Sequence, residues 1–318
     1  MEKIDMVYLW CDGNDPEFIK RKNQYLPAEK NIEVNGDKRF FDNDELKYSL
    51  RSLEKNVPWI NHVFIVTDRQ VPRWLNLNYN KVTIIDHSEI MPKEVIPCFN
   101  SAVIEYFLAF IPNLSEKFLY GNDDMMFGGK VTPNDFFIGN KPIVRVKQVK
   151  WANIEEVTEN QYSHVKTVYN SLCLLKKQNS KDLLNFTLHH NIDAYNKTSF
   201  LETYYKYETE LRKCIHNKFR NLNDIERHLF SFDMIYKDKA ILKVVNDPKP
   251  WRRMLNFIFP VNWESYVDED SEHTRNEIMK YKPMLFCLNG NNDCSVDEKM
   301  KSKKFMENLF PKPSKFEK

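Results

Sequence analysis

Short apolar runs alternate with helical patterns in the first 120 residues, and this alternation restricts the fold more than any other feature. Four runs have the length and the β-branched or aromatic content of strands buried on both faces, at 4–10, 63–67, 82–85 and 118–120. Helical patterns separate them, one capped at Asp42 and stopped by Pro58, the other at 101–111. Strands separated by helices predict an α/β fold with a mostly parallel, Rossmann-like sheet covered on both faces.

Longer, charged and aromatic helical patterns follow Gly139. We expect a helical insertion over 150–240, with helices at 203–214 and 224–236. Ser199 and Glu202 have the spacing of a capping box before the first of these helices. A strand at 284–288 should then return to the sheet. The whole chain, 1–318, is therefore interpreted as one domain with a core at 1–149, the insertion at 150–240, and a return to the core plus a C-terminal helix at 241–318.

One of the strand patterns ends in two adjacent carboxylates, Asp123 and Asp124, closed by Gly128 and Gly129. The chain has only 7 glycines, so their gathering here indicates a close backbone approach. Ligands bind beyond the carboxyl ends of parallel strands, where paired acids suit a divalent cation and a phosphorylated substrate. An ordinary turn with solvated acids is the alternative.

Composition narrows the class of protein. The 47 basic and 45 acidic residues give a net charge of +2, so no global field favours nucleic acid or an anionic membrane. The six scattered cysteines contain no Cys-x-x-Cys pair, which favours reduced thiols and a cytoplasmic location. The sequence shows no signal-peptide pattern, membrane-spanning run, Walker loop or dinucleotide fingerprint. The basic, aromatic stretch 249–263 is a candidate acceptor or membrane contact, with core packing as its alternative.

Four blocks of sequence carry a resemblance to a known family. They are 4–16 (IDMVYLWCDGNDP); 39–46 with 58–60, 64–68 and 122–128 (NDDMMFG); His190 with Lys197, Phe219-Arg220 and Asp224-Ile225; and 286–289 (FCLN) with 309–314. With these blocks in order, the chain resembles the Stealth family. That family includes bacterial capsular polysaccharide phosphotransferases and the catalytic subunit of N-acetylglucosamine-1-phosphotransferase.

The resemblance implies a GT-A-like fold, with the core at 1–149 binding a nucleotide sugar, and a phosphotransferase activity. The enzyme would move a sugar 1-phosphate from a UDP-sugar to a hydroxyl of an oligosaccharide or polysaccharide acceptor, release UMP, and build a capsular or cell-surface polymer. It would use Mg²⁺ or Mn²⁺, work in the cytoplasm and dock, if at all, on the inner face of the membrane.

Residue roles follow from the same resemblance. The metal ligands would be Asp123, Asp124 and Asp293, and the catalytic residues Asp123, His190, Arg220 and Asp5. The substrate-binding residues would be Asp12, Arg39, Asn100, Asn122, Lys197 and Asn289. One position departs from the family, because Gly290 replaces the aspartate that usually follows Cys-Leu-Asn, which is why Asp293 is considered. Asp5, inside an apolar run, needs a partner, for which Arg39 and Arg51 are candidates.

Two alternatives use the same residues. A conventional glycosyltransferase would attack the anomeric carbon and release UDP rather than UMP. A glycan-binding protein without turnover is the other alternative, and Gly290 is its one supporting feature.

Overall fold

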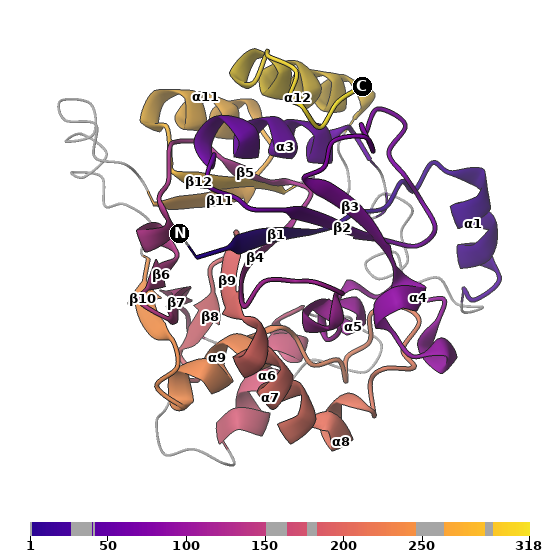
Figure 1. Cartoon of the computed structure of the whole chain (residues 1–318), viewed down its shortest axis with the longest axis vertical. Helices are drawn as coiled ribbons and strands as arrows, with labels where there is room; N and C mark the ends of the chain where they lie inside the picture. Colours follow the sequence, from indigo (N-terminus) through magenta and orange to yellow (C-terminus); the bar gives the residue numbers. More distant parts are fainter. Residues whose placement is uncertain are drawn as a thin grey trace.

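The computed structural model describes residues 2–26, 40, 42–150, 164–176, 183–245, 264–289 and 295–318. Its main sheet has five strands in the order β3-β2-β1-β4-β9 (Figure 1). They are β1 (Ile4–Leu9), β2 (Val63–Thr67), β3 (Val82–Asp86), β4 (Lys117–Asn122) and β9 (Asp193–Asn196). The first four are parallel, whereas β9 runs antiparallel to β4. The predicted mostly parallel α/β sheet and its four predicted strands are confirmed.

Helices cover both faces of the main sheet, as predicted (Figure 1). α3 (Glu45–Asn56) covers one face, and α11 (Glu272–Tyr281) and α12 (Val296–Leu309) lie on the same side, where they share an apolar cluster with Tyr48 of α3. The other face carries α5 (Ser101–Glu105), α6 (His164–Lys176), α7 (Lys197–Lys206) and α9 (His228–Tyr236). Three shorter helices are α1 (Pro16–Asn23), α4 (His87–Ile90) and α8 (Glu208–Leu211).

Alternation along β1 supplies both cores. Met6 and Tyr8 belong to the apolar cluster that includes Leu50 of α3, whereas Val7 belongs to the cluster on the opposite face, which includes Leu229 of α9. Successive side chains of a strand point to opposite faces, so a run such as Met6 to Leu9, which is apolar at every position, must be covered on both faces.

Two smaller sheets flank the main one. The first, called the small sheet below, has the order β11-β12-β5 and consists of β5 (Met125–Phe127), β11 (Ser265–Glu269) and β12 (Leu285–Asn289). The second has the order β10-β7-β6, with β8 also paired to β7. Its strands are β6 (Phe137–Ile138), β7 (Lys141–Gln148), β8 (Phe186–Leu188) and β10 (Ile241–Val244).

The small sheet and β9 correct two predictions. The segment 150–240 is not a purely helical insertion, because it also supplies β8 and β9, and β9 completes the main sheet. The strand predicted at 284–288 exists as β12, but it pairs with β11 and β5 instead of the main sheet. A residue pattern identifies a strand more readily than its partner, since pairing is decided by segments far away in the chain.

Helix boundaries also differ from expectation. The residue before the first turn of α3 is Asp44, with a φ of 65°, and not Asp42 as predicted. The Asp42 carboxylate accepts a hydrogen bond from the backbone amide of Asp44. The pattern at 101–111 forms α5 followed by a 3₁₀ turn at Leu108–Phe110. Ser199 lies inside α7, and α9 begins four residues later than expected, at His228 rather than at 224. The stretch 249–263 lies outside the described residues.

Side chains of α3 hold β5 along the edge opposite β12. The Ser49 hydroxyl donates to the Met125 carbonyl (2.5 Å), and the Asn56 side-chain amide donates to the Phe127 carbonyl (2.5 Å). The backbone amide of Phe127 donates to the Ser52 hydroxyl (3.0 Å). The three side chains are three and four residues apart, a spacing that places them on one face of a helix. The strand that follows Asp123 and Asp124 is therefore fixed on both edges.

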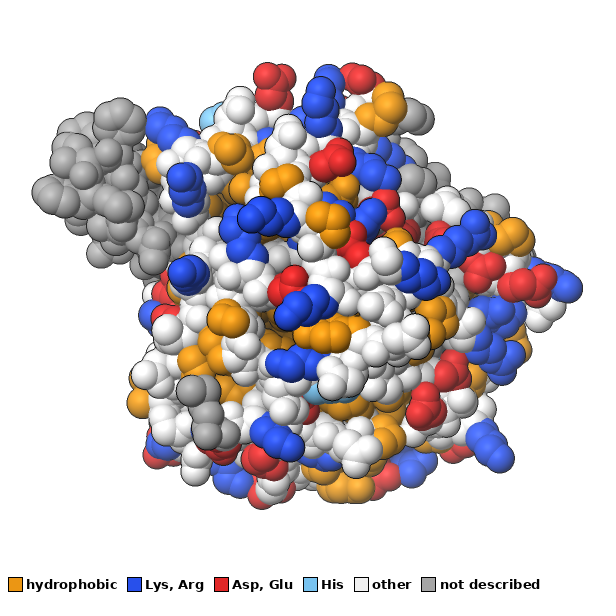
Figure 2. All heavy atoms as spheres, turned by 45° about the horizontal axis from the view of Figure 1, so that its top comes forward, with side chains coloured by type: hydrophobic (Ala, Val, Ile, Leu, Met, Phe, Trp, Pro, Cys, Tyr) orange, Lys and Arg blue, Asp and Glu red, His pale blue; other side chains and the backbone are white. Residues whose placement is uncertain are grey.

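On the face over α3, α11 and α12, basic, acidic and apolar side chains are intermixed, so it carries no large patch of one charge (Figure 2). Among the described helices, none has both the length and the apolar content that crossing a bilayer requires.

Gly128 provides the close approach that the sequence indicated. A Cβ atom at this position would overlap the carbonyl oxygen of Pro283, which is backbone and cannot swing aside, whereas a Cβ at Gly129 would meet only the Met284 Cα at 3.9 Å. We expect Gly128→Ala to lower the free energy of unfolding by about 1–3 kcal/mol, the usual cost of overpacking. Gly129→Ala is the matched control and should stay close to wild type. Urea titrations of both variants test this, and equal stabilities would contradict it.

Candidate active site

The turn between β4 and β5 presents Asp123 and Asp124 at the carboxyl end of β4. Asn122 closes the strand, with the Tyr120 hydroxyl 3.0 Å from its Oδ1. β4 lies beside β1 in the parallel sheet, so the turn sits at the edge where ligands of such sheets bind. Both carboxylates are partly buried.

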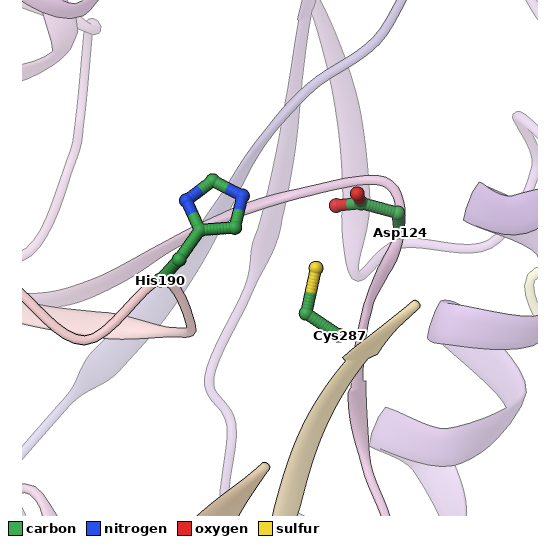
Figure 3. Close-up of side chains that lie close together, drawn as sticks. All are labelled: Asp124, His190 and Cys287. Atoms are coloured by element: carbon green, nitrogen blue, oxygen red, sulfur yellow. The ribbon is translucent and has the colours of Figure 1, made fainter. Parts of the chain in front are cut away.

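Three side chains from distant segments converge beside this turn (Figure 3). They are Asp124, His190 from the loop after β8, and Cys287 from β12, and their ligand atoms all lie within 4.8 Å of one another. The pairing of Cys287 with Met125 places the thiol next to the diacid. Carboxylate, imidazole and thiol are all metal-ligand types, and the first two also transfer protons.

Further acids surround the pair. Burial, and then the neighbouring carboxylates Asp124, Glu45 and Asp42, hold the pKa of Asp123 well above its ordinary value. Burial also raises the pKa of Glu45 to about 8, with Asp42 and Asp124 adding to the shift. The pKa of Asp42 rises to about 6, again chiefly through burial. Carboxyl groups from two segments thus lie close together in a partly buried place, an arrangement that a cation relieves.

The diacid fits a divalent cation. Asp124 Oδ1 is buried and has no hydrogen-bond partner among the described residues, so this oxygen is available as a ligand. Carboxylate oxygens suit Mg²⁺ or Mn²⁺, whereas the nearby thiol and imidazole suit softer ions. Burial and the charge of Asp124 raise the pKa of Cys287 well above its ordinary value, which keeps its thiol protonated, and this S–H donates to Asp124. Asp123 and Asp124 are therefore the residues that would hold the metal.

His190 is neutral at physiological pH. Its pKa falls to about 3, first because the ring is desolvated by burial and then because Arg227, His164 and Arg220 are nearby. A neutral imidazole in this position can accept a proton or a hydrogen bond.

Arg220 approaches the same place from the segment before α9. Its guanidinium donates to the Ser101 hydroxyl at 2.7 Å, and its charge is felt by His190. The structure thus brings together three predicted site residues, namely Asp123, Asp124 and His190, and Arg220 lies near enough for its charge to lower the pKa of His190.

A buried ion-pair network under the site was missed at the sequence level. Arg227 is only 6% exposed, and it contacts Asp193 (2.8 Å) and Glu105 (3.4 Å). Glu105 also accepts a hydrogen bond from Tyr120 (2.8 Å), two residues before Asn122. The positive charge of Arg227 lowers the pKa of both Asp124 and His190. In the sequence, Glu226-Arg227-His228 resembles an exposed helix start, so no local signal marks Arg227.

Asp5 and Lys197 lie near the amino ends of the parallel strands, at the other end of the sheet from Asp123 and Asp124, and this corrects their predicted place in the site. Asp5 is fully buried near the amino end of β1, and it accepts hydrogen bonds from Asn61 (2.7 Å) and the Ser115 amide (2.7 Å). Lys197 follows β9, whose last residue pairs with Lys117 at the start of β4. Arg51, a suggested partner of Asp5, instead pairs with Glu317 (2.7 Å).

The remaining predicted residues divide into supports and rim positions. Asn100 is fully buried, caps α5 and donates to Asp224 (2.9 Å) and the Phe219 carbonyl (3.2 Å), so these bonds hold the segment that carries Arg220. Asp12 follows β1. Its backbone amide donates to the Gln70 side chain (3.0 Å), and its backbone carbonyl accepts from the same side chain (2.9 Å), while its carboxylate contributes to the raised pKa of Asp42. Arg39, Asp293 and the side chain of Asn289 lie outside the described part of the chain.

Comparison with known proteins gives consistent matches. Residues 2–30 match conserved region 1 of Stealth proteins and residues 39–144 match conserved region 2. The chain is 34% identical to the capsular polysaccharide phosphotransferase cps1A of Actinobacillus pleuropneumoniae over 76% of this chain and 68% of that protein. It is 29% identical to WcwK of Streptococcus pneumoniae, also named a capsular polysaccharide phosphotransferase, over 100% and 99% of the two chains.

Other matches are partial or looser. The chain is 31% identical to the capsular polysaccharide phosphotransferase SacB of Neisseria meningitidis serogroup A over 99% of its own length, but it spans only 57% of that protein. A solved structure of the galactosyltransferase LgtC with donor and acceptor sugar analogs aligns over 98% of each chain at 11% identity, with a TM-score of 0.46. A TM-score this low carries no weight for function.

The crowded acids predict a pH dependence of stability in metal-free protein. The folded pKa of Glu45, about 8, lies above its unfolded value, so between about pH 5 and 8 the folded state binds more protons than the unfolded state. The free energy of unfolding should therefore fall as pH rises through this range. Glu45→Gln should flatten the fall, whereas Glu202→Gln, on the exposed surface of α7, should leave it unchanged. Urea titrations with chelator at several pH values in this range measure how the free energy of unfolding changes with pH. The same decrease in Glu45→Gln as in wild type would contradict the prediction.

Proposed function

Since this chain belongs to the Stealth family, we propose that it transfers a sugar 1-phosphate from a UDP-sugar to a hydroxyl group of a glycan acceptor. The relatives named capsular polysaccharide phosphotransferases support this reaction class and point to a capsular or cell-surface polysaccharide as the product. The core at 1–149 would bind the donor, because it supplies the ends of the parallel strands. The five described cysteines are all free, which supports a cytoplasmic site, and any contact with the inner face of the membrane would be peripheral.

The observation that carries the proposal is that Asp124 and His190 lie together at the carboxyl end of β4, beside Asp123, and that the charge of Arg220 reaches His190. A diphosphate brings negative charge that this acidic pocket would repel without a countercharge. A divalent cation bound to the diacid would supply that countercharge and polarise the phosphoryl oxygens. Arg220 offers a planar fork to the oxygens of the phosphorus that is attacked.

The bonding changes follow from the chemistry of the diphosphate. The acceptor oxygen forms a bond to the sugar-proximal phosphorus, while the bond from that phosphorus to the bridging oxygen breaks and UMP leaves. The acceptor hydroxyl loses its proton in this step. The unprotonated imidazole of His190 would accept it, and the Asp124 carboxylate within 4.8 Å would stabilise the imidazolium against the burial and the positive neighbours that hold the pKa of His190 low. The product is a phosphodiester between sugar and glycan.

The released nucleotide tests the reaction. We expect purified protein supplied with UDP-sugars, Mg²⁺ or Mn²⁺ and an oligosaccharide acceptor to release UMP, and phosphorus NMR to show a phosphodiester in the glycan. Chelator, Asp123→Asn or Asp124→Asn should reduce the rate by about 100-fold or more. Asp297→Asn is the control, since Asp297 is exposed on α12. Release of UDP would instead indicate transfer at the anomeric carbon, and glycan binding without turnover would indicate a binding protein.

Arg220 can be tested by a substitution that keeps its charge. Lysine loses the planar fork, so Arg220→Lys should lower kcat/KM by roughly 10- to 100-fold, because charge alone does not reproduce bidentate contacts. The control is Arg212→Lys, at an exposed residue of the same segment that pairs with Glu208. Steady-state kinetics of UMP release measure both variants. An Arg220→Lys enzyme as active as the control would remove Arg220 from the proposed phosphate contact.

A further inference from the structure

The three converging side chains depend on a frame that joins their segments. Asp124 immediately precedes β5, Met125 of β5 pairs with Cys287 of β12, and Leu285 of β12 pairs with Ser265 of β11. The small sheet therefore fixes Asp124 and Cys287 relative to each other through backbone hydrogen bonds. His190 belongs to a different segment, between β8 and β9, and needs a separate connection to this frame.

Ser265 makes that connection through both neighbours of His190. Its Oγ accepts a hydrogen bond from Asn191 Nδ2 (2.9 Å) and lies 3.0 Å from His189 Nδ1. A hydroxyl carries one hydrogen, so Ser265 can accept from Asn191 and donate to His189 at the same time. All three side chains are buried, with exposures of 6%, 1% and 5% for Ser265, Asn191 and His189.

The loop itself is tightly bonded. The Asn191 amide donates to the His189 carbonyl (2.7 Å), and the His189 amide donates to the Arg145 carbonyl (2.9 Å). One residue earlier, the Leu188 amide donates to His228 Nε2 (3.1 Å). These bonds shape the loop and tie it to β7 and α9, whereas the Ser265 bonds tie it to the small sheet that carries Cys287.

We propose that Ser265 is a positioning residue, whose hydroxyl holds the loop of residues 189–191 so that His190 faces Asp124 and Cys287. Its effect on turnover rests on the proposed function, but its effect on His190 does not. Ser265 touches neither the diacid nor His190 in the described contacts, so it acts through His189 and Asn191. Without the hydroxyl, two buried polar groups lose a shared partner, and the loop must shift or admit water to satisfy them.

The experiment compares substitutions at Ser265 with one matched control. Ser265→Ala removes the hydroxyl, Ser265→Thr keeps it on a residue suited to strands, and Ser265→Cys keeps the volume with a weaker hydrogen-bonding group. Ser271→Ala is the control, because Ser271 caps α11 through the Thr274 backbone amide (3.1 Å) and, among the described residues, has no hydrogen bond to the loop 189–191. Loss of a cap typically costs about 1 kcal/mol, so this control also reports a purely structural defect.

Two readouts separate positioning from folding. The first is the NMR signal of the His190 ring in histidine-labelled protein, assigned with His190→Gln and recorded without substrate. The second is the kinetics of UMP release. We expect Ser265→Ala to shift the His190 signal and to lower kcat by roughly 10- to 100-fold with KM for the donor nearly unchanged, as for a displaced catalytic group. Ser265→Thr should recover most of both, Ser265→Cys should be intermediate, and Ser271→Ala should match wild type.

The outcomes are distinguishable. A His190 signal and a kcat in Ser265→Ala equal to those of wild type would overturn the positioning role. Equal losses in Ser265→Ala and Ser271→Ala would overturn it as well, since they would reflect stability alone. If Ser265→Ala does not fold, the comparison of Ser265→Cys with Ser265→Thr decides in the same way. If the wild-type protein releases no UMP, the proposed function fails, and the His190 signal still tests the role of Ser265.

Discussion

The burial of several carboxylates close to one another is the constraint on which the rest of this structure depends. Burial is the largest cause of the raised pKa values of Asp123, Glu45 and Asp42. The charges of Asp124, Glu45 and Asp42 raise the pKa of Asp123 further, and those of Asp42 and Asp124 raise that of Glu45. Arg227 offsets part of this charge from below, where Asp193 and Glu105 hold it. The offset is incomplete, because the pKa values of the acids stay high. A site in this state favours a cation, and with it an anionic ligand.

The late part of the chain completes a site that the early part begins. β4 supplies the diacid, yet the strand after it is held by α3 on one edge and by β12 on the other. α12 reaches the same region, since Lys303 pairs with Asp44 (2.5 Å) and Asn43 donates to the Lys299 carbonyl (3.1 Å). The loop that carries Asp42 and Glu45 is therefore fixed by a helix more than 250 residues away in sequence.

Local patterns predicted the parallel strands, the diacid and the close approach at Gly128, because apolar runs, paired acids and glycines are local signals. His190 and Arg220 are conspicuous polar residues of the segment 150–240, but it is the resemblance that assigns them to the site. Asp5 was misplaced although its position at the amino end of a parallel strand argued against the site. Arg227, Glu45 and Cys287 were not assigned to the site, since burial of a charge and the partner of a strand are set by tertiary packing.

The reversed direction of β9 explains why two residues of one sequence block are separated. His190 precedes the strand and Lys197 follows it, so they lie at opposite edges of the main sheet although they are seven residues apart. The length of β9 therefore sets the distance between the His190 imidazole and the amino ends of the parallel strands. The side chains of β9 alternate between the two apolar clusters, with Ala194 in one and Tyr195 in the other, so inserting or deleting a single residue would exchange the faces of the side chains that follow it. Change in this segment is therefore restricted to steps of two residues, or to none.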